Sequence, residues 1–392
     1  HHREFWRAAS NFCQTEILDT HRVELLSLVA TERVRALRHH FGRANRSADA
    51  KAGTRLMAAK KKQAANIYDV AKLAGVSHQT VSRVLNGHPS IRPATKSKVE
   101  AAAKQLNYRP SMAARALVTK RNSMLGIIVG DTGLYGPAGM LNAMERQARD
   151  AGYYSLTVAI KQDSPDSWSD GIEHLRRIGV EGLVCIAIKK EALEMVARAN
   201  AGVPIVTIDT EEIKGVTTVG IDNTQGAQIA TNHLISLGHK NILHISGPAG
   251  SIEARARVDG YKRAMKKAGL KPLVVAGDWS SSTGFRLGLE VNLQQNKISS
   301  VFLANDHLAV GFLHAMRVRG ISVPKDLSVV GFDSIPESPY LDPPLTTVEQ
   351  DFDKLGKTAM EQLFFKLAGL QPSTQAPLVP TLVLRESTSR KR

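Results

Sequence analysis

The chain has 392 residues, of which 43% are hydrophobic, so it is too long for one ordinary core and too apolar for a disordered chain. Its formal net charge is +16 at pH 7. Residues 57–120 hold 12 basic against 2 acidic residues, whereas residues 121–392 hold 30 against 28. This distribution indicates a nucleic-acid-binding head on a nearly neutral body, although an ordinary solvated basic surface would have the same composition.

The two cysteines, Cys13 and Cys185, have no disulfide or metal-ligand spacing. We therefore expect neither a metal nor another cofactor, and a reducing, cytoplasmic location. No apolar run approaches the roughly 20 residues needed to span a bilayer, so no membrane partner is expected.

The segment before the basic block has little pattern of its own. Residues 1–56 contain no methionine and little apolar periodicity, whereas Met57 is followed at once by three lysines and a well-patterned region. Our hypothesis is that Met57 is the true start. On this view residues 1–56 lie upstream of the start. The whole extension ahead of the patterned domain, residues 1–63, is expected to be either such upstream sequence or disordered.

Residues 64–109 are predicted to form a helix-turn-helix domain. Two apolar sets recur at helical spacing: Ile67, Val70, Ala71 and Ala74, then Val81, Val84 and Leu85. Gly75 suits the left-handed residue that ends the first helix, and Ser77 suits the N-cap of the second. A third helix is predicted from Pro93 to Tyr108. A small helical hairpin with a polar face would have the same pattern.

The solvent face of the predicted second helix carries side chains that can read DNA. Glutamine can pair bidentately with adenine and arginine with guanine, while shorter polar groups reach bases or phosphates. The predicted DNA contacts of this region are Ser77, His78, Gln79, Thr80, Ser82, Arg83 and Asn86. Lysines of the third helix, Lys96, Lys98 and Lys104, are available for phosphates.

The strings YDVAKLAGVS and QTVSRV place residues 66–121 in a clear resemblance to the DNA-binding head of the lactose-repressor (LacI) family. The resemblance implies that residues 110–122 form a hinge helix and linker, and that two such helices enter the minor groove of palindromic DNA. Ala114 and Leu117 are then predicted DNA contacts. An apolar side chain such as Leu117 can wedge between base steps and kink the duplex.

From residue 123 onward, short apolar runs alternate with longer amphipathic segments, which predicts a two-lobed α/β body with doubly wound parallel sheets. The expected strands are Leu125–Val129, Ser155–Ala159, Gly182–Ile186, Ile205–Ile208, Asn241–Ile245, Val301–Ala304 and Ser328–Phe332. The expected helices include Met140–Ala151, Thr224–Leu237, Arg255–Ala268, Ala309–Arg319 and Lys354–Ala368.

Polar residues cluster where the expected strands end, which is where ligands bind in such folds. Asp209, the pair Asn305 and Asp306, and Asp333 each follow a strand and could hydrogen-bond sugar hydroxyls. Arg257 could clamp a pair of ligand oxygens, and Trp279 could stack on a sugar ring. Helix caps, a surface ion pair and core packing are the structural alternatives for these residues.

The resemblance extends over residues 66–388, through GPAGSIEARARVDGY, GDWSSSTGF, LANDHLAVG, SVVGFD and PPLTTVEQDF. It implies a periplasmic-binding-protein-like core over residues 123–392, with lobe 1 at about 123–221 and 352–379 and lobe 2 at about 222–351 and 380–388. The ligand-binding positions that it implies are Asp209, Arg257, Trp279, Asn305, Asp333 and Gln350.

Two of these positions, Arg257 and Asp333, are shared with purine-binding members of the family, whereas Trp279 with Asn305 resembles the sugar-binding pattern. The wall at residues 134–137, and Ile221, depart from the lactose-binding pattern, so a galactoside and a glucoside both stay open. The chain ends without the leucine-heptad helix through which a tetrameric member assembles, so a homodimer is expected.

We therefore expect a DNA-binding repressor of bacterial sugar-utilisation genes, in the cytoplasm and associated with the nucleoid, that a small sugar releases from a palindromic operator. A regulator whose ligand tightens DNA binding is an alternative. A sugar-binding protein without DNA function has the same body but no use for residues 67–85. An enzyme built on Asp209 and Asp333 would need an activated nucleophile or base, and the sequence contains no GxSxG motif, metal cluster or P-loop, so we expect no catalysis.

Overall fold

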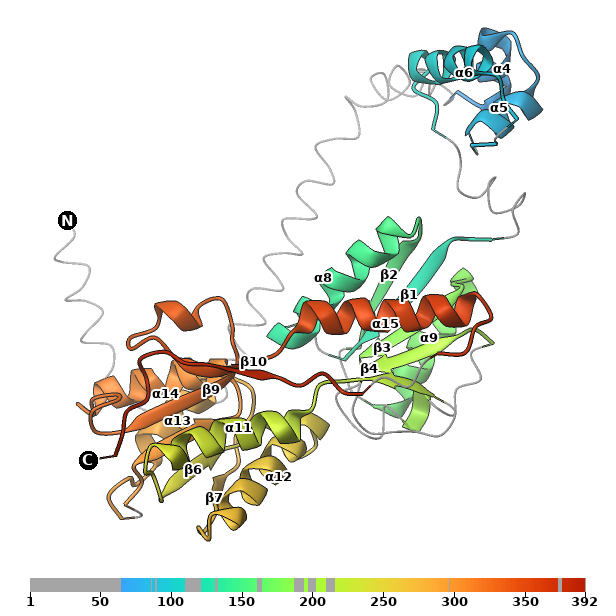
Figure 1. Ribbon diagram of the computed structural model, residues 1–392. Helices are drawn as coiled ribbons and strands as arrows, with labels where there is room; N and C mark the ends of the chain where they lie inside the picture. Colours follow the sequence, from blue (N-terminus) through green and yellow to red (C-terminus); the bar gives the residue numbers. More distant parts are fainter. Residues whose placement is uncertain are drawn as a thin grey trace, which may run out of the picture. The chain divides into compact units, whose positions relative to one another are not determined.

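The computed structural model describes residues 65–85, 87, 88, 90–109, 121–130, 133–160, 164–186, 194–196, 202–208, 216–295, 297–372 and 376–391 (Figure 1). The chain divides into two compact units, His1–Pro110 and Ser111–Arg392. Within the described residues, no helix is both long enough and apolar enough to cross a membrane.

The described residues of the first unit form three helices, α4 (Ile67–Ala74), α5 (His78–Leu85) and α6 (Pro93–Gln105). Asn66 caps α4 in a reciprocal capping box with Asp69. Gly75 ends that helix at φ 65°, where a side chain would be strained. Apolar residues of all three helices meet in one core, as the spacing predicted: Val70, Ala71, Val81, Val84, Val99, Ala102 and Ala103.

The second unit contains a first sheet in which all neighbouring strands are parallel. Its strands are β1 (Met124–Val129), β2 (Tyr154–Ala159), β3 (Gly182–Ile186), β4 (Ile205–Ile208) and β5 (Thr217–Val219), in the order β2-β1-β3-β4-β5. Helices α8 (Tyr135–Asp150) and α15 (Phe352–Leu367) pack on the face that holds Ile127, and α9 (Pro165–Ile178) packs on the face that holds Ile128. The central strands β1 and β3 are therefore buried on both faces, which their continuous apolar runs reflect, whereas the edge strand β2 is only half-buried.

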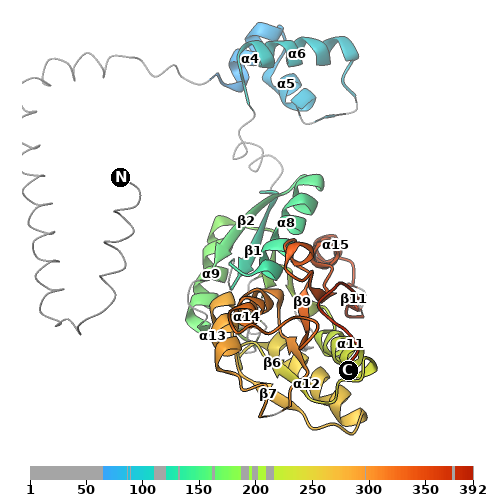
Figure 2. The same cartoon turned by 90° about the vertical axis from the view of Figure 1, so that its left-hand side faces the viewer.

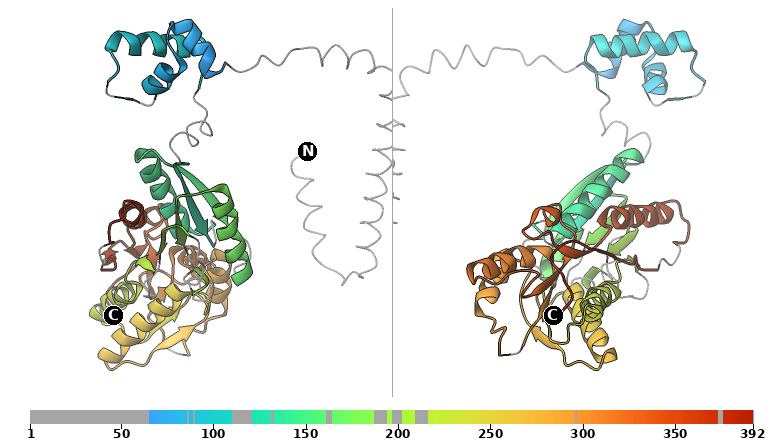
Figure 3. Two further views of the ribbon diagram at one scale, coloured as in Figure 1. Left: turned by 90° about the vertical axis from the view of Figure 1, so that its right-hand side faces the viewer. Right: turned by 60° about the vertical axis from the view of Figure 1, so that its left-hand side comes forward.

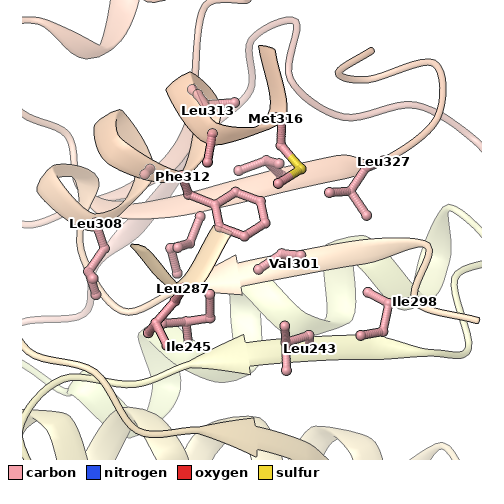
Figure 4. Packing of buried hydrophobic residues seen from close by; sticks show 14 of the residues in the cluster. Leu243, Ile245, Leu287, Ile298, Val301, Leu308, Phe312, Leu313, Met316 and Leu327 are labelled. Carbon is pink, nitrogen blue, oxygen red and sulfur yellow. The ribbon is translucent and has the colours of Figure 1, made fainter. Parts of the chain in front are cut away.

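The second sheet has the order β11-β10-β9-β8-β6-β7, and only its edge pair β10–β11 is antiparallel. The strands are β6 (Ile242–Ile245), β7 (Leu273–Val275), β8 (Ser300–Leu303), β9 (Ser328–Asp333), β10 (Thr346–Glu349) and β11 (Thr381–Val383). The pair α13 (Ser281–Glu290) and α14 (Asp306–Val318) covers one face, around Phe312 (Figure 4). The pair α11 (Asn223–Ser236) and α12 (Ile252–Lys267) covers the other face (Figure 2).

The chain passes between the two sheets more than once. After β5 it enters α11 beside the second sheet, after β10 it returns as α15 to the first sheet, and it then comes back as β11. The right-hand view of Figure 3 shows this last segment, in red, running from α15 to the second sheet. The predicted α/β fold with two parallel, doubly wound sheets is confirmed.

Several helices begin earlier than expected. α8 begins at Tyr135 and not at Met140, and α12 begins at Ile252 and not at Arg255. α14 and α15 likewise begin three and two residues earlier than the apolar spacing predicted. In α12, α14 and α15 a polar N-cap side chain accepts a backbone N–H of the first turn, which fixes where the helix begins.

A buried carboxylate, Asp306, joins the ends of β8, β9 and β10. It accepts hydrogen bonds from Thr347 Oγ1 at 2.6 Å, Ser338 Oγ at 2.5 Å and the Ile335 N–H at 3.0 Å. The sequence made Asp306 a possible sugar contact. Its oxygens are instead occupied by these internal donors, so it fixes the loops that follow the strands.

We predict that Asp306→Ala lowers the free energy of unfolding by at least about 3 kcal/mol, because it leaves several buried donors without an acceptor. Thr347→Val, which removes one donor, should cost only about 1 kcal/mol. Urea denaturation of the full chain measures both. Equal effects of the two substitutions would contradict the central role of Asp306.

His244 lies in the core of the second sheet without access to solvent. Its Nδ1–H donates to the Phe302 carbonyl at 3.0 Å, and its ring stacks on that of Phe302 with centroids 4.5 Å apart. Burial lowers the pKa of His244 to about 4, and nearby Arg257 adds to this shift. The folded state therefore holds this histidine neutral, whereas the unfolded chain takes up a proton near pH 6.5.

This difference makes the stability depend on pH. The contribution of His244 is complete above pH 6.5 and is lost as the pH falls towards about 4, at about 1.4 kcal/mol per pH unit. The free energy of unfolding of the wild type should therefore fall by up to about 2 kcal/mol more than that of His244→Phe between pH 7 and pH 5. Parallel pH curves for the two proteins would contradict this account.

Candidate functional site

The polar face of α5 is open to solvent. Ser77 Oγ accepts the Thr80 N–H at 3.1 Å and lies 2.9 Å from Thr80 Oγ1, so this serine caps α5. Side chains of His78, Gln79 and Arg83 are exposed, and Thr80 and Ser82 are half-buried beside them. The structure thus brings six of the predicted DNA contacts to one helix and its N-terminus. Asn86, Ala114 and Leu117 lie outside the described residues.

Helix α6 of the same unit exposes positive charge. Lys96, Lys98 and Lys104 of α6 are all exposed. Lys96 lies 3.9 Å from Glu100, an exposed pair of little energetic weight. The three lysines are therefore available to phosphates, which position a protein on DNA without reading its sequence.

A cavity of about 100 Å³ lies between the two sheets of the second unit, several times the roughly 10–15 Å³ that one water needs. Five of the six ligand contacts that the sequence predicted line it: Arg257, Trp279, Asn305, Asp333 and Gln350. The sixth, Asp209, lies outside the described residues. The cavity is therefore where residues from five separate segments of the second sheet's lobe meet.

Two of these residues stand at the carboxyl ends of neighbouring strands. Asp333 ends β9 at φ 109°, a strained conformation for a residue with a side chain. Gln350 follows β10 and donates from Nε2 to Asp333 Oδ1 at 2.7 Å. Such strain is often found at functional sites, where the surrounding contacts enforce it.

Asn305 is bonded both to its own helix and to the backbone of Trp279. Asn305 caps α14, since its Oδ1 accepts the Leu308 N–H at 2.9 Å, and its Nδ2 donates to the Trp279 carbonyl at 3.1 Å. A Cβ at Gly247 would lie 2.4 Å from the Trp279 ring, so only glycine fits beside the indole there. The backbone thus approaches one side of Trp279 closely and fixes where its ring lies.

Arg257 is buried at the centre of the cavity's polar wall. Its Nε donates to Asn223 Oδ1 at 2.8 Å, and its Nη1 donates to the Ala304 carbonyl and lies 3.5 Å from Asp333 Oδ1. The guanidinium also lies over the rings of Phe332 and Trp279, at 3.9 and 5.3 Å. Burial lowers the pKa of Arg257 and raises the pKa of Asp333 to about 7, and each partner opposes the other's shift.

The cavity also has residues that sequence reasoning missed. Glu253 and Asn223 join the polar wall, while Met140, Phe352 and Leu355 extend the apolar wall around Leu134, Tyr135, Pro137 and Ile221. Glu253 lies on α12 four residues before Arg257, a spacing that places both side chains on one helix face. This spacing of four residues is the sequence feature from which Glu253 could have been predicted to lie beside Arg257. In the described part of the chain, no group of three His, Cys, Asp or Glu side chains is placed to hold a metal.

Comparison with known proteins gives two family matches. Residues 66–111 match the model of bacterial regulatory proteins of the lacI family, and residues 231–388 match a periplasmic binding protein-like domain. The first match covers helices α4, α5 and α6, and the second covers all six strands of the second sheet together with α15.

Curated relatives match most of the chain. The lactose operon repressor of Escherichia coli K12 is 30% identical over 324 residues, which are 82% of this chain and 90% of the relative. The ribose operon repressor of the same organism is 34% identical over 332 residues, or 82% and 99% of the two chains.

A crystal structure of the lac repressor dimer bound to operator and the anti-inducer ONPF superposes with a TM-score of 0.76 at 30% identity, and covers 83% of this chain and 99% of that one. These matches span both the helical unit and the two-sheet unit. The chain therefore belongs to the lacI family of bacterial regulatory proteins, as a transcriptional repressor with a DNA-binding head and an effector-binding core.

Proposed function

We propose that this repressor binds a palindromic operator of sugar-utilisation genes as a homodimer and is released when a small sugar occupies the cavity between the two sheets. The observation that carries the proposal is the meeting of Arg257, Trp279, Asn305, Asp333 and Gln350 on one cavity. Asn305 and Asp333 were predicted from strand ends, and the family pattern implied all five.

The DNA-binding part of the proposal rests on α5. Gln79 and Arg83 project from its exposed face and are suited to adenine and guanine edges in the major groove. Ser77, by contrast, has a structural role as the helix cap in addition to any contact with DNA. We propose that residues 110–122 act as the hinge, with Ala114 and Leu117 in the minor groove.

The sugar part of the proposal rests on the chemistry of the cavity. Asn305 and Gln350 supply amide groups that both donate and accept, which suits hydroxyls, and Trp279 supplies a flat apolar ring. The relatives named as lactose and ribose operon repressors act in sugar metabolism by name, which supports a sugar as the effector. A galactoside or a glucoside is the proposed class.

Coupling between the effector and DNA follows from the position of the cavity. Leu134 and Phe352 reach it from the lobe of the first sheet and Arg257 reaches it from the other lobe. A ligand that draws the lobes together would change the spacing of the first lobes in a dimer and so the hinges. Because coupling is reciprocal, operator must weaken effector binding by the same factor.

Arg83→Ala should weaken operator binding by about 1–3 kcal/mol, or roughly 5- to 150-fold, and relax specificity at one base pair, while sugar binding stays unchanged. Lys104→Ala serves as the contrast. Loss of a phosphate contact should weaken all DNA sequences alike and lower the salt dependence of the affinity by about one unit. Fluorescence anisotropy with selected operator and scrambled DNA measures both, and an unchanged operator affinity of Arg83→Ala would refute the assignment.

Trp279→Leu should raise the sugar concentration for half-release of operator at least about tenfold, because the flat ring that stacks on the sugar is lost. Operator affinity without sugar should not change. Phe285→Leu is the matched control, because Phe285 packs on the same core but does not line the cavity. If both variants respond to sugar as the wild type does, the ring has no role in binding.

A further inference from the structure

Glu253 adds a second carboxylate to the cavity, and no part of the proposed function accounts for it. It lies in the first turn of α12 and lines the cavity together with Arg257. Its Oε2 accepts a hydrogen bond from Ser251 Oγ at 2.7 Å, and Ser251 is itself the N-cap of the helix. One neutral hydroxyl is thus the side-chain donor that the described residues offer to this carboxylate.

The charges that line the cavity do not balance. Its described wall has the carboxylates of Glu253 and Asp333 and one guanidinium, that of Arg257, and neither lysine nor histidine. Arg257 is already engaged, because it bonds Asn223 and the Ala304 carbonyl and lies 3.5 Å from Asp333. Within the described wall, Glu253 is therefore the carboxylate that no cation hydrogen-bonds, and the opposite wall is mostly apolar. Burial raises the pKa of Glu253 more than the charges of Arg257 and Arg255 lower it.

A bound effector would remove water from Glu253. Burying a carboxylate without a compensating charge is costly, and the free protein already shows this cost, since burial raises the pKa of Glu253. An anionic effector such as a sugar phosphate would add repulsion. A neutral sugar could donate hydrogen bonds from its hydroxyls, but the negative charge of Glu253 would remain uncompensated. A cation would compensate that charge through a stronger, charge-assisted hydrogen bond.

We infer that Glu253 is a specificity-determining residue that selects an effector with a protonated amine, so that the sugar of the proposed function is an amino sugar. The inference rests on that proposed function. In the bound state the ammonium group donates to Glu253, while Asn305, Gln350 and the Trp279 ring hold the uncharged part of the sugar.

The test is calorimetric titration of the full-length protein with matched pairs of sugars. Each pair is a methyl glucoside or galactoside and the same glycoside with an amine in place of one hydroxyl, at C2, C3, C4 or C6. At least one amino sugar should bind about tenfold or more tightly than its parent at pH 7, and N-acetylation, which removes the charge, should abolish the gain.

Glu253→Gln keeps the shape of the side chain and should reduce the preference for the amine at least about tenfold, with operator binding intact as the check on folding. Asp259→Asn removes the same charge from an exposed position on the same helix and should retain the preference. If the parent sugars bind as tightly as the amino sugars, both in the wild type and in Glu253→Gln, this inference is wrong. The proposed function is not affected by that result. If none of the sugars binds, the proposed function fails and the inference fails with it.

Discussion

Arg257 must keep a full positive charge inside the protein, and the cavity is arranged around that requirement. Its hydrogen bonds and ion pair reach the start of α11, the residue after β8 and the end of β9. Removing one partner of such a buried set is strongly destabilising, so these segments are tied to one geometry. The strained backbone of Asp333 and its bond from Gln350 extend that geometry to β10. Within the described residues, the cavity thus has a rigid polar wall on the lobe of the second sheet and an apolar wall on the lobe of the first sheet.

Much of the fold could be predicted from the sequence because the helices and buried strands have strong periodic patterns. Val81 and Ala71 pack as the spacing predicted, and the long apolar runs are strands. Three-residue strands such as β7 are too short to have a pattern and are defined only by their pairing with β6. α13 was not among the expected helices, because a sequence with Gly284 and Gly288 has low helical propensity; these glycines lie where α13 packs closely on α14.

The cavity residues that could be predicted from the residues alone were mainly those that directly follow an expected strand. Asn305 and Asp333 were found because parallel strands bring their carboxyl ends to one edge, whereas Gln350 was found only through the resemblance to the family. Position alone did not separate ligand contacts from structural groups, and Asp306 proved to be a buried acceptor for three donors. Glu253 was missed because it begins a helix, where an acidic residue is commonplace and needs no ligand to explain it.

We propose that occupation of the cavity controls the affinity of the head for DNA. This is tested most directly by operator binding of the full-length protein to a selected pool of palindromic DNA, with and without a panel of galactosides, glucosides and their amino derivatives. We expect tight binding without sugar and a loss of roughly 5- to 150-fold with at least one of them. Operator affinity that no sugar changes, or the absence of any DNA binding, would contradict it.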